Sequence, residues 1–405
     1  MEPQDQVNGL RAFPSLHKKL GTCRINIDSV SESFNRPFLI EANRREVLYP
    51  ELINGVRVIT VSSGTALIVA CPGTRNAFTL TNDKSMDVTC YDGQLVSSSD
   101  SQVFEYDELG CSRRPRASLN QAKNSKCGQN GSRYNIGWNI MSNIFIPLVH
   151  LCFDAEKEAT EFTFHKIQGR SIDHKIVDSS RPSFHSGGMF TADVGNIYKK
   201  RSQKALFKEL LHTYDHLSGQ GQHFLARGHL APDSDFFWAA EQDATYLYGN
   251  VVPQWQAFNN GNWKRLEFAI RELAEKHMST FEVWTGSYGT LQMPDANNNF
   301  ISIFLGLTEG KRLVPVPFLL WKVIYDPSLR QAVAVVSINE VRGDGMAEEV
   351  DLMESPCPDI CNQITWIDWD TQDVRRGRTF CCHVGDLRAT ISSVPTLGNV
   401  DLLAQ

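Results

Sequence analysis

The chain has 405 residues, of which 41% are hydrophobic and 21% are charged, as in an ordinary globular protein with room for two or three domains. Its formal net charge is −6, so binding of a polyanion would depend on a local positive surface rather than on the overall charge. No apolar run reaches the length of about 18 residues that a membrane helix requires, so we expect no membrane partner.

The first 140 residues are predicted to be rich in β-strands. Residues 56–71 alternate in polarity and contain many β-branched side chains, which is typical of strands. Further short strands are expected over residues 77–80, 87–91 and 102–106. Residues 112–135 are polar and rich in turn formers, so they are predicted to be a loop. We therefore expect an N-terminal domain of residues 1–140, bearing disulfides, and a second domain of residues 141–405.

The second half of the chain mixes helices with strands. Helical spacing of apolar residues is found over residues 204–216 and, more clearly, over residues 264–277, where Leu266, Ile270 and Leu273 share one face. Short strands are expected over residues 162–168, 189–193 and 222–225. Longer apolar runs that would form a central sheet follow over residues 281–289, 300–307, 316–326 and 332–339. This mixture indicates an α+β fold.

The ten cysteines fall into two groups, at the N-terminal and C-terminal ends of the chain. An even number is typical of a disulfide-bonded protein from an oxidising compartment, so we expect five disulfides and secretion. The glycosylation sequon at Asn130 agrees with secretion. One alternative is a cytosolic protein with reduced thiols. Another is a zinc site formed by the cysteines of residues 357–382 together with His383.

Residues 226–267 contain the side chains best suited to chemistry. Arg227-Gly228-His229 precedes the segment Asn250–Gln254, then Asn259 and, within the second predicted helix, Glu267. A neutral histidine can take a proton from water, and an asparagine oxygen is a hard ligand that suits magnesium. An arginine can bind phosphate through two parallel hydrogen bonds. Together these groups suit metal-assisted hydrolysis of a phosphodiester.

This segment resembles the DNA/RNA non-specific endonucleases of the ββα-metal (His-metal) type, which include shrimp digestive deoxyribonucleases and insect double-stranded ribonucleases. The family pattern is Arg-Gly-His, Asn-x-x-Pro-Gln, a metal-binding Asn and a Glu two helical turns later, and all four parts are present in order. The family commonly has Asp before the Arg, where this chain has Ala226. The resemblance implies a ββα-metal core with a central, mostly antiparallel sheet flanked by helices, next to the N-terminal β-rich domain.

The resemblance also implies a role for each motif residue. His229 would be the general base, Arg227 would stabilise the charge that builds on the phosphate, and Asn259 would hold Mg²⁺, with Mn²⁺ as a substitute. Glu267 lies about 12 Å along a helix from Asn259, at 1.5 Å per residue, so it would act on the metal through a bound water. Supporting or phosphate-binding roles are expected for Gly228, Asn250 and Gln254.

Positive charge is concentrated just before the motif. Residues 199–229 contain six basic and two acidic side chains, a local charge of +4 (6 − 2) in an acidic chain. A solvated helix surface would give the same pattern. We expect a phosphate-tracking groove for nucleic acid that includes Lys199, Lys200, Arg201 and Lys204.

These expectations describe a secreted, monomeric, magnesium-dependent endonuclease that cuts double-stranded DNA and leaves 5′-phosphate ends. Double-stranded RNA, or either sugar without preference, is the alternative substrate, because nothing in the motif reads a base or a 2′-hydroxyl. An alternative of another class is a non-catalytic nucleic-acid-binding protein on a nuclease scaffold. The intact His229, Asn259 and Glu267 favour the enzyme.

Overall fold

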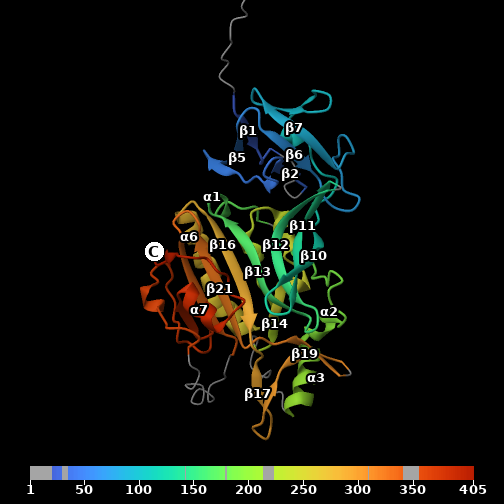
Figure 1. The fold of residues 1–405 in the computed structure, drawn as a ribbon. Coiled ribbons are helices and arrows are strands. Elements are labelled where there is room, and N and C mark those ends of the chain that lie inside the picture. Colours follow the sequence, from blue (N-terminus) through green and yellow to red (C-terminus); the bar gives the residue numbers. More distant parts are fainter. Residues whose placement is uncertain are drawn as a thin grey trace, which may run out of the picture.

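A nine-stranded sheet occupies the middle of the molecule (Figure 1). The computed structural model describes residues 21–29, 35–141, 143–177, 180–212, 223–308, 310–340 and 355–405. The strands of the central sheet are β10 (Ser118–Cys127), β11 (Gly131–Met141), β12 (Ile144–Asp154), β13 (Ala159–Gln168), β16 (Thr280–Tyr288), β21 (Leu319–Asp326), β22 (Gln331–Ile338), β23 (Thr379–Cys382) and β24 (Asp401–Leu402). Eight strands pair antiparallel in that order, and β24 runs parallel to β22.

Helices cover the two faces of this sheet and explain the burial of its central strands. Helix α6 (Lys264–Lys276) packs Leu266 and Ile270 against one face. Helix α7 (Val384–Thr390) packs Leu387 against the other face. Seven of the eight residues of β21 are therefore buried, which is why this strand is an almost continuous apolar run rather than an alternating one.

The N-terminal part of the chain lies at one end of the central sheet (Figure 1). Its strands are β1 (Cys23–Asn26), β2 (Phe38–Glu41), β3 (Glu46–Val47), β4 (Glu51–Ile53), β5 (Val56–Val61), β6 (Ala66–Ala70), β7 (Ser85–Tyr91), β8 (Gln94–Ser97) and β9 (Val103–Phe104). They form a six-stranded sheet, in the order β3-β2-β6-β7-β8-β9, and a three-stranded sheet, β1-β5-β4. The core of this part continues into the rest of the protein, since Phe38 contacts Trp138 and Trp238 at ring-centroid distances of 4.6 and 6.3 Å.

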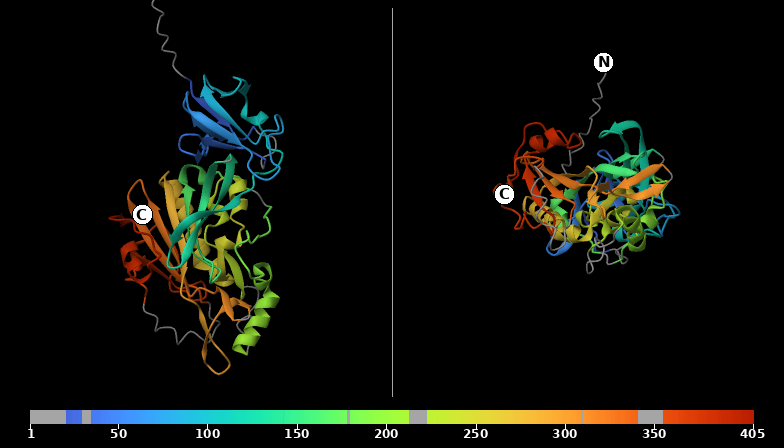
Figure 2. Two further views of the ribbon diagram at one scale, coloured as in Figure 1. Left: turned by 45° about the vertical axis from the view of Figure 1, so that its right-hand side comes forward. Right: turned by 90° about the horizontal axis from the view of Figure 1, so that it is seen from below.

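Smaller elements complete the described part of the chain. The short helices before the motif are α1 (Gly169–Ile172), α2 (Val194–Ile197) and α3 (Lys200–Leu211), and α4 (Ala239–Ala244) lies within it. Two hairpins follow α6, formed by β17 (Gln292–Pro294) with β18 (Phe300–Ser302) and by β19 (Phe304–Thr308) with β20 (Lys311–Pro315). The hairpins and α3 lie together at the end opposite the N-terminal sheets, where Ala296 N donates to Leu211 O at 3.0 Å (Figure 2).

The main expectations about the fold are confirmed. The protein is α+β, its central sheet is mostly antiparallel and flanked by helices, and its N-terminal part is β-rich. The helix predicted over residues 264–277 is α6. The helix predicted over residues 204–216 begins earlier, at Lys200, and its described part ends at Leu211, with His212 left-handed at a φ of 56°. Residues 213–216 lie outside the described residues.

Four local predictions are wrong. Residues 300–307 do not join the central sheet but form β18 and β19, which belong to two separate hairpins. The expected loop at residues 112–135 contains most of the β10–β11 hairpin, whose polar residues face solvent at the edge of the sheet. Residues 189–193 form no strand, because they follow a turn at Gly187 and Gly188, which both have positive φ. Residues 77–80 contribute only an isolated bridge between Phe78 and Cys111.

The position of the β10–β11 hairpin conflicts with the expected boundary between the two domains. Strands β10 and β11 precede residue 142 but belong to the central sheet, so the division into residues 1–140 and 141–405 cuts a sheet strand. Tyr49 of the N-terminal part further donates a hydrogen bond to the buried Glu241 of α4 at 2.6 Å. Independent folding of the two expected domains stays a prediction.

All ten cysteines are paired, as five disulfides. The pairs are Cys23–Cys90, Cys71–Cys111, Cys127–Cys152, Cys357–Cys382 and Cys361–Cys381. The alternatives of reduced thiols and of a zinc site at the C-terminal cysteines are therefore wrong. None of the helices in the described ranges is both long and apolar enough to span a membrane.

Candidate active site

Two short strands followed by a helix carry the residues of the motif. Strand β14 (Leu225–His229) pairs antiparallel with β15 (Val251–Trp255), so that His229 lies opposite Val251. The chain then turns through Asn259–Trp263 into α6. Because side chains alternate along a strand, Arg227 and His229 lie on the same face of β14. The ββα arrangement therefore places an imidazole and a guanidinium on one face of β14, and it places Asn259 in the turn that joins β15 to α6.

His229 is enclosed by aromatic rings. Its imidazole lies 5.3 Å from the ring of Phe184 and 5.2 Å from the ring of Tyr246, and its Nε2 is buried, with no hydrogen-bond partner among the described residues. Burial lowers the pKa of His229 to about 4, although the nearby Asp233 carboxylate opposes this shift. The ring is therefore neutral, and able to accept a proton, throughout the neutral pH range.

Arg227 is held by the same aromatic cluster. Its Nε donates to the Tyr248 hydroxyl at 3.1 Å, and its guanidinium carbon lies 5.5 Å from the ring centroids of Phe184, Tyr198 and Tyr248. Cation–π contacts of this kind fix a guanidinium without neutralising it. No carboxylate of the described residues pairs with Arg227, so its terminal nitrogens can bind an anion.

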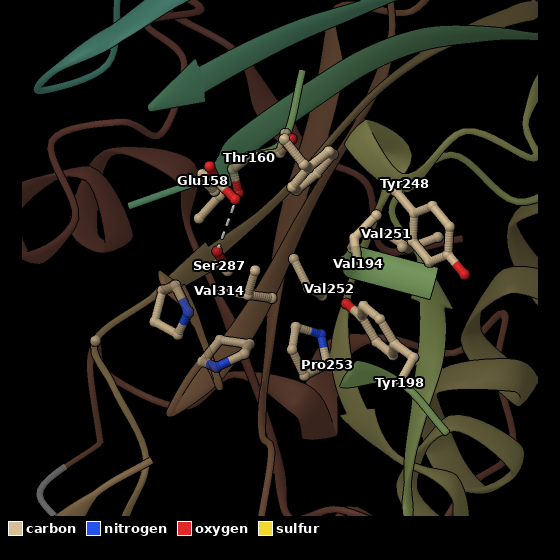
Figure 3. A pocket seen from close by; sticks show the side chains of 15 residues that line it. Glu158, Thr160, Val194, Tyr198, Tyr248, Val251, Val252, Pro253, Ser287 and Val314 are labelled. Atoms are coloured by element: carbon tan, nitrogen blue, oxygen red, sulfur yellow. Dashed lines mark hydrogen bonds between the residues drawn. The ribbon is translucent and has the colours of Figure 1, made fainter. Parts of the chain in front are cut away.

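A small cavity lies beside β15 and shares two of these rings (Figure 3). Tyr198 and Tyr248 lie at one side of it, and Glu158, Thr160 and Ser287 lie at the other. Ser287 Oγ donates to the Thr160 carbonyl oxygen at 3.4 Å. The Glu158 carboxylate accepts from nearby backbone N–H groups. These polar groups of the cavity therefore already have partners within the protein.

Asn250 supports the segment that follows the catalytic strand. Its side chain is fully buried, accepts from Ala231 N at 3.0 Å, and donates to the carbonyl oxygens of Ala231 and Thr245 at 2.8 and 3.0 Å. Its own carbonyl oxygen accepts from Leu230 N at 2.9 Å. Every donor and acceptor of this side chain is in use, so Asn250 orients the chain after His229.

The remaining polar groups of the motif fit a hydrated metal ion. Gln254 is fully buried, and neither polar atom of its amide has a hydrogen-bond partner within the described ranges. A Cβ at Gly228 would collide with Gln254 Oε1, so this position of β14 requires glycine. Asn259 makes no side-chain hydrogen bond to any described residue, and Glu267 makes none either. The unpaired side-chain oxygens of Asn259 and Glu267 suit Mg²⁺, which keeps several of its waters when bound.

Nearby charged groups influence the ionisation of Glu267. Burial raises the pKa of the Glu267 carboxyl, while the Lys322 ammonium opposes this shift. Lys322 is itself fully buried in β21, donates to Thr285 Oγ1 at 2.6 Å, and lies 5.3 Å from the Trp263 ring centroid. A buried cation requires compensation by nearby negative charge, so Lys322 favours the ionised form of Glu267.

Sequence reasoning missed several residues of this site. Phe184, Tyr246 and Tyr248 enclose the base and the arginine, and no local pattern marks them. Arg271 binds Asp235 at 2.8 Å, which in turn binds the buried His165 at 2.8 Å. One indication of Arg271 is present in the sequence: it lies four residues after Glu267 and therefore on the same face of α6.

The expected groove residues are all exposed. Lys200 and Lys204 lie on one face of α3, with Arg201 beside them and Lys199 just before the helix. Lys200 Nζ lies 3.8 Å from the Phe224 ring centroid, next to the start of β14. The basic residues thus come directly after Tyr198 in the chain, and the ring of Tyr198 contacts Arg227.

A model of the DNA/RNA non-specific endonuclease family matches residues 128–387, more than half of the chain. The chain belongs to this family. The matched range includes seven of the nine strands of the central sheet, both motif strands and α6, and it excludes both N-terminal sheets. The protein is therefore a nuclease, and the alternative of a non-catalytic binding protein is not supported.

Two relatives cover almost the whole length of this nuclease. A salivary endonuclease of Lutzomyia longipalpis is 26% identical over 93% of this chain and 85% of its own length. The salivary protein Tsal2A of Glossina morsitans morsitans is 23% identical over 93% of this chain and 92% of its own. The N-terminal β-rich part is thus shared with these proteins.

Two further similarities are more limited. The mitochondrial nuclease EXOG of Mus musculus is 36% identical over 100 residues, which are 24% of this chain and 26% of that protein. A solved structure of the EndoG/EndoGI complex is 19% identical, with a TM-score of 0.31, over 49% of this chain and 74% of that chain. The latter similarity is too low to place residues of this chain on that structure.

Proposed function

We propose that this nuclease hydrolyses phosphodiester bonds within double-stranded DNA, requires Mg²⁺, and leaves 5′-phosphate ends. The observation that carries this proposal is the shared face of β14, which holds a neutral, buried His229 beside an Arg227 that no carboxylate of the described residues neutralises. A base and an unpaired cation on one face are what hydrolysis of a phosphodiester requires.

In the proposed mechanism, the His229 imidazole takes a proton from the attacking water, and the resulting hydroxide attacks phosphorus in line. The bond from phosphorus to the 3′ oxygen breaks, and the departing 3′ oxygen takes a proton from solvent water, which leaves the phosphate on the 5′ end. The terminal nitrogens of Arg227 bind a non-bridging phosphate oxygen and stabilise its growing negative charge. The rings of Phe184 and Tyr246 keep bulk water from His229. Asn259 would hold a divalent ion, with Glu267 acting on it through a bound water, and the ion would supply Lewis-acid stabilisation. Gln254 would support the two motif strands.

The substrate assignment rests on charge and on the resemblance to duplex-cutting arthropod nucleases. The basic groove residues beside the site would bind the phosphate backbone of any nucleic acid. Its test is a matched digestion of double-stranded DNA, single-stranded DNA and double-stranded RNA of equal length. We expect the largest kcat/KM for double-stranded DNA. A larger value for double-stranded RNA would transfer the assignment to that alternative.

The acid–base behaviour of His229 can be measured directly. Because burial lowers its pKa to about 4, the ring is expected to stay neutral down to about pH 4, and the base is not lost between pH 5 and pH 7. An NMR titration of the histidine side chains in the metal-free protein should show one ring that titrates near pH 4 and disappears in His229→Ala. Titration of that ring near the reference pKa of about 6.5 would contradict the buried geometry.

The groove makes a second prediction, about ionic strength. Replacing Lys200 and Lys204 together with serine is expected to raise the Kd for duplex DNA and to reduce the slope of log Kd against log salt by about two, since each phosphate contact contributes about 0.9. A double replacement of Lys123 and Lys166, which are exposed on the central sheet, is the matched control. Equal slopes in the two double variants would show that α3 is not part of the binding surface.

We also propose that the protein is secreted and acts as a monomer. Five disulfides support an oxidising compartment, and the names of the long relatives describe salivary proteins. The monomer follows from the chemistry, because one active site of this kind needs no second copy.

A further inference from the structure

The turn that carries Asn259 is held by a loop from the far C-terminal part of the chain. Asn262, which is 3% exposed, donates from its side-chain Nδ2 to the carbonyl oxygens of Asp370 and Gly377 at 2.8 and 2.9 Å. Its backbone N–H donates to the carbonyl oxygen of Arg376 at 3.0 Å. Three hydrogen bonds therefore join the middle of this turn to residues 368–378, which we name the C-terminal loop.

The shape of the turn explains why it needs this support. Residues 259–263 form a wide π-type turn in which Gly261, at φ −88° and ψ −129°, leaves the helical conformation. A turn of this kind lacks the regular hydrogen bonds that hold an α-helix in place. The C-terminal loop also fits closely against it, because a Cβ at Gly261 would collide with the Arg376 backbone.

The C-terminal loop is itself fixed at its base. Disulfides Cys361–Cys381 and Cys357–Cys382 tie the chain before the loop to β23, which pairs with β22 at the edge of the central sheet. Thr379 N, at the start of β23, donates to Thr371 O of the loop at 2.8 Å. The carbonyl oxygens that receive Asn262 therefore have fixed positions relative to the sheet.

We propose that Asn262 is a positioning residue: it fixes the Asn259 turn on the C-terminal loop and so determines the affinity of the site for a divalent ion. The proposal rests on the proposed function, in which Asn259 is the metal ligand. A single neutral oxygen ligand gives weak binding, so any freedom of its turn lowers the affinity directly. Partners that orient a metal ligand typically change metal affinity by about 10- to 100-fold when they are removed.

The test measures binding of Mn²⁺ alone to the full-length protein, by the loss of the EPR signal of the free ion. Asn262→Ala is expected to weaken Mn²⁺ binding by about tenfold or more. Its matched control is Asn260→Ala, in the same turn but exposed, which should bind within about twofold of the unaltered protein. Gly377→Ala is a second probe, because a Cβ there would collide with Phe258 and displace the loop carbonyl. Thermal unfolding of each variant is recorded in parallel.

The outcomes separate this inference from the proposed function. If Asn259→Ala binds Mn²⁺ as well as the unaltered protein does, the metal assignment itself fails. If Asn259→Ala loses binding while folded Asn262→Ala and Gly377→Ala keep full affinity, only the positioning role is overturned. Loss of the folded state in both of these variants would also overturn it, because the loop would then serve folding rather than metal affinity.

Discussion

Replacing His229 with alanine is expected to lower kcat on double-stranded DNA by about 10²- to 10⁴-fold, which is the usual contribution of a general base. The Kd for DNA should stay within about twofold, because binding comes from the basic residues and not from a neutral ring. Two quantities are measured, the rate of single-turnover cleavage and the Kd for DNA in the presence of EDTA. A larger effect on KM than on kcat would contradict the role of His229 as the base.

The control for this substitution is His150→Ala. His150 is exposed on β12 and interacts with Asn135 and Phe164 rather than with the motif. Its loss should leave kcat unchanged. An equal fall in kcat for both variants would indicate a general effect of removing a histidine and would leave His229 without a special function.

Replacing Asn259 with alanine is expected to lower the cleavage rate by about 100-fold or more at a magnesium concentration that saturates the unaltered protein. A bound metal ion contributes several kcal/mol to stabilisation of the transition state, and each 1.4 kcal/mol corresponds to about tenfold. The rate should partly recover as the magnesium concentration is raised, because the weakened site fills at higher concentration.

The neighbouring Asn260 again provides the comparison, since it has the same side chain and lies exposed in the same turn. Asn260→Ala should keep the magnesium dependence of the unaltered protein. If Asn260→Ala shows the shift and Asn259→Ala does not, the family spacing has been assigned to the wrong asparagine. A rate that does not depend on magnesium in either variant would contradict metal-assisted hydrolysis.

The elements that the sequence predicts best are those with strong local periodicity. Helix α6 has apolar residues at helical spacing, and strands β21 and β22 are long β-branched runs, so each is apparent without tertiary information. The β10–β11 hairpin was missed because its residues are mostly polar and solvent-facing at the edge of the sheet. Its stability comes from pairing with β12 and from the Cys127–Cys152 disulfide, neither of which shows in a local pattern.

The site likewise contains residues that a local pattern identifies and residues that only long-range contacts bring together. The spacing from His229 to Asn259 and Glu267 is local information, and it identified the motif. The aromatic ring of Phe184 reaches His229 from 45 residues away, which no periodic pattern indicates. The contact of Asn262 with Asp370 spans 108 residues. Contacts of this range depend on how the sheet and its disulfides bring distant segments together.

The departure at Ala226 has a structural consequence that the sequence could not show. Ala226 lies directly opposite Gln254 in the β14–β15 ladder. A carboxylate at Ala226 would lie beside the unpaired amide of Gln254, and the alanine provides no such partner. Because side chains alternate along a strand, Ala226 and Gln254 lie on the face of the ladder opposite Arg227 and His229, where the amide of Gln254 lacks this partner.

The central claim is a magnesium-dependent hydrolysis performed by the β14–β15–α6 site. The most direct measurement follows cleavage of double-stranded DNA by the unaltered protein with magnesium, after addition of EDTA, and after magnesium is restored in excess. We predict cleavage that stops with EDTA, returns with magnesium and leaves 5′-phosphate ends. Cleavage that continues in EDTA would contradict the claim, as would its absence under all three conditions.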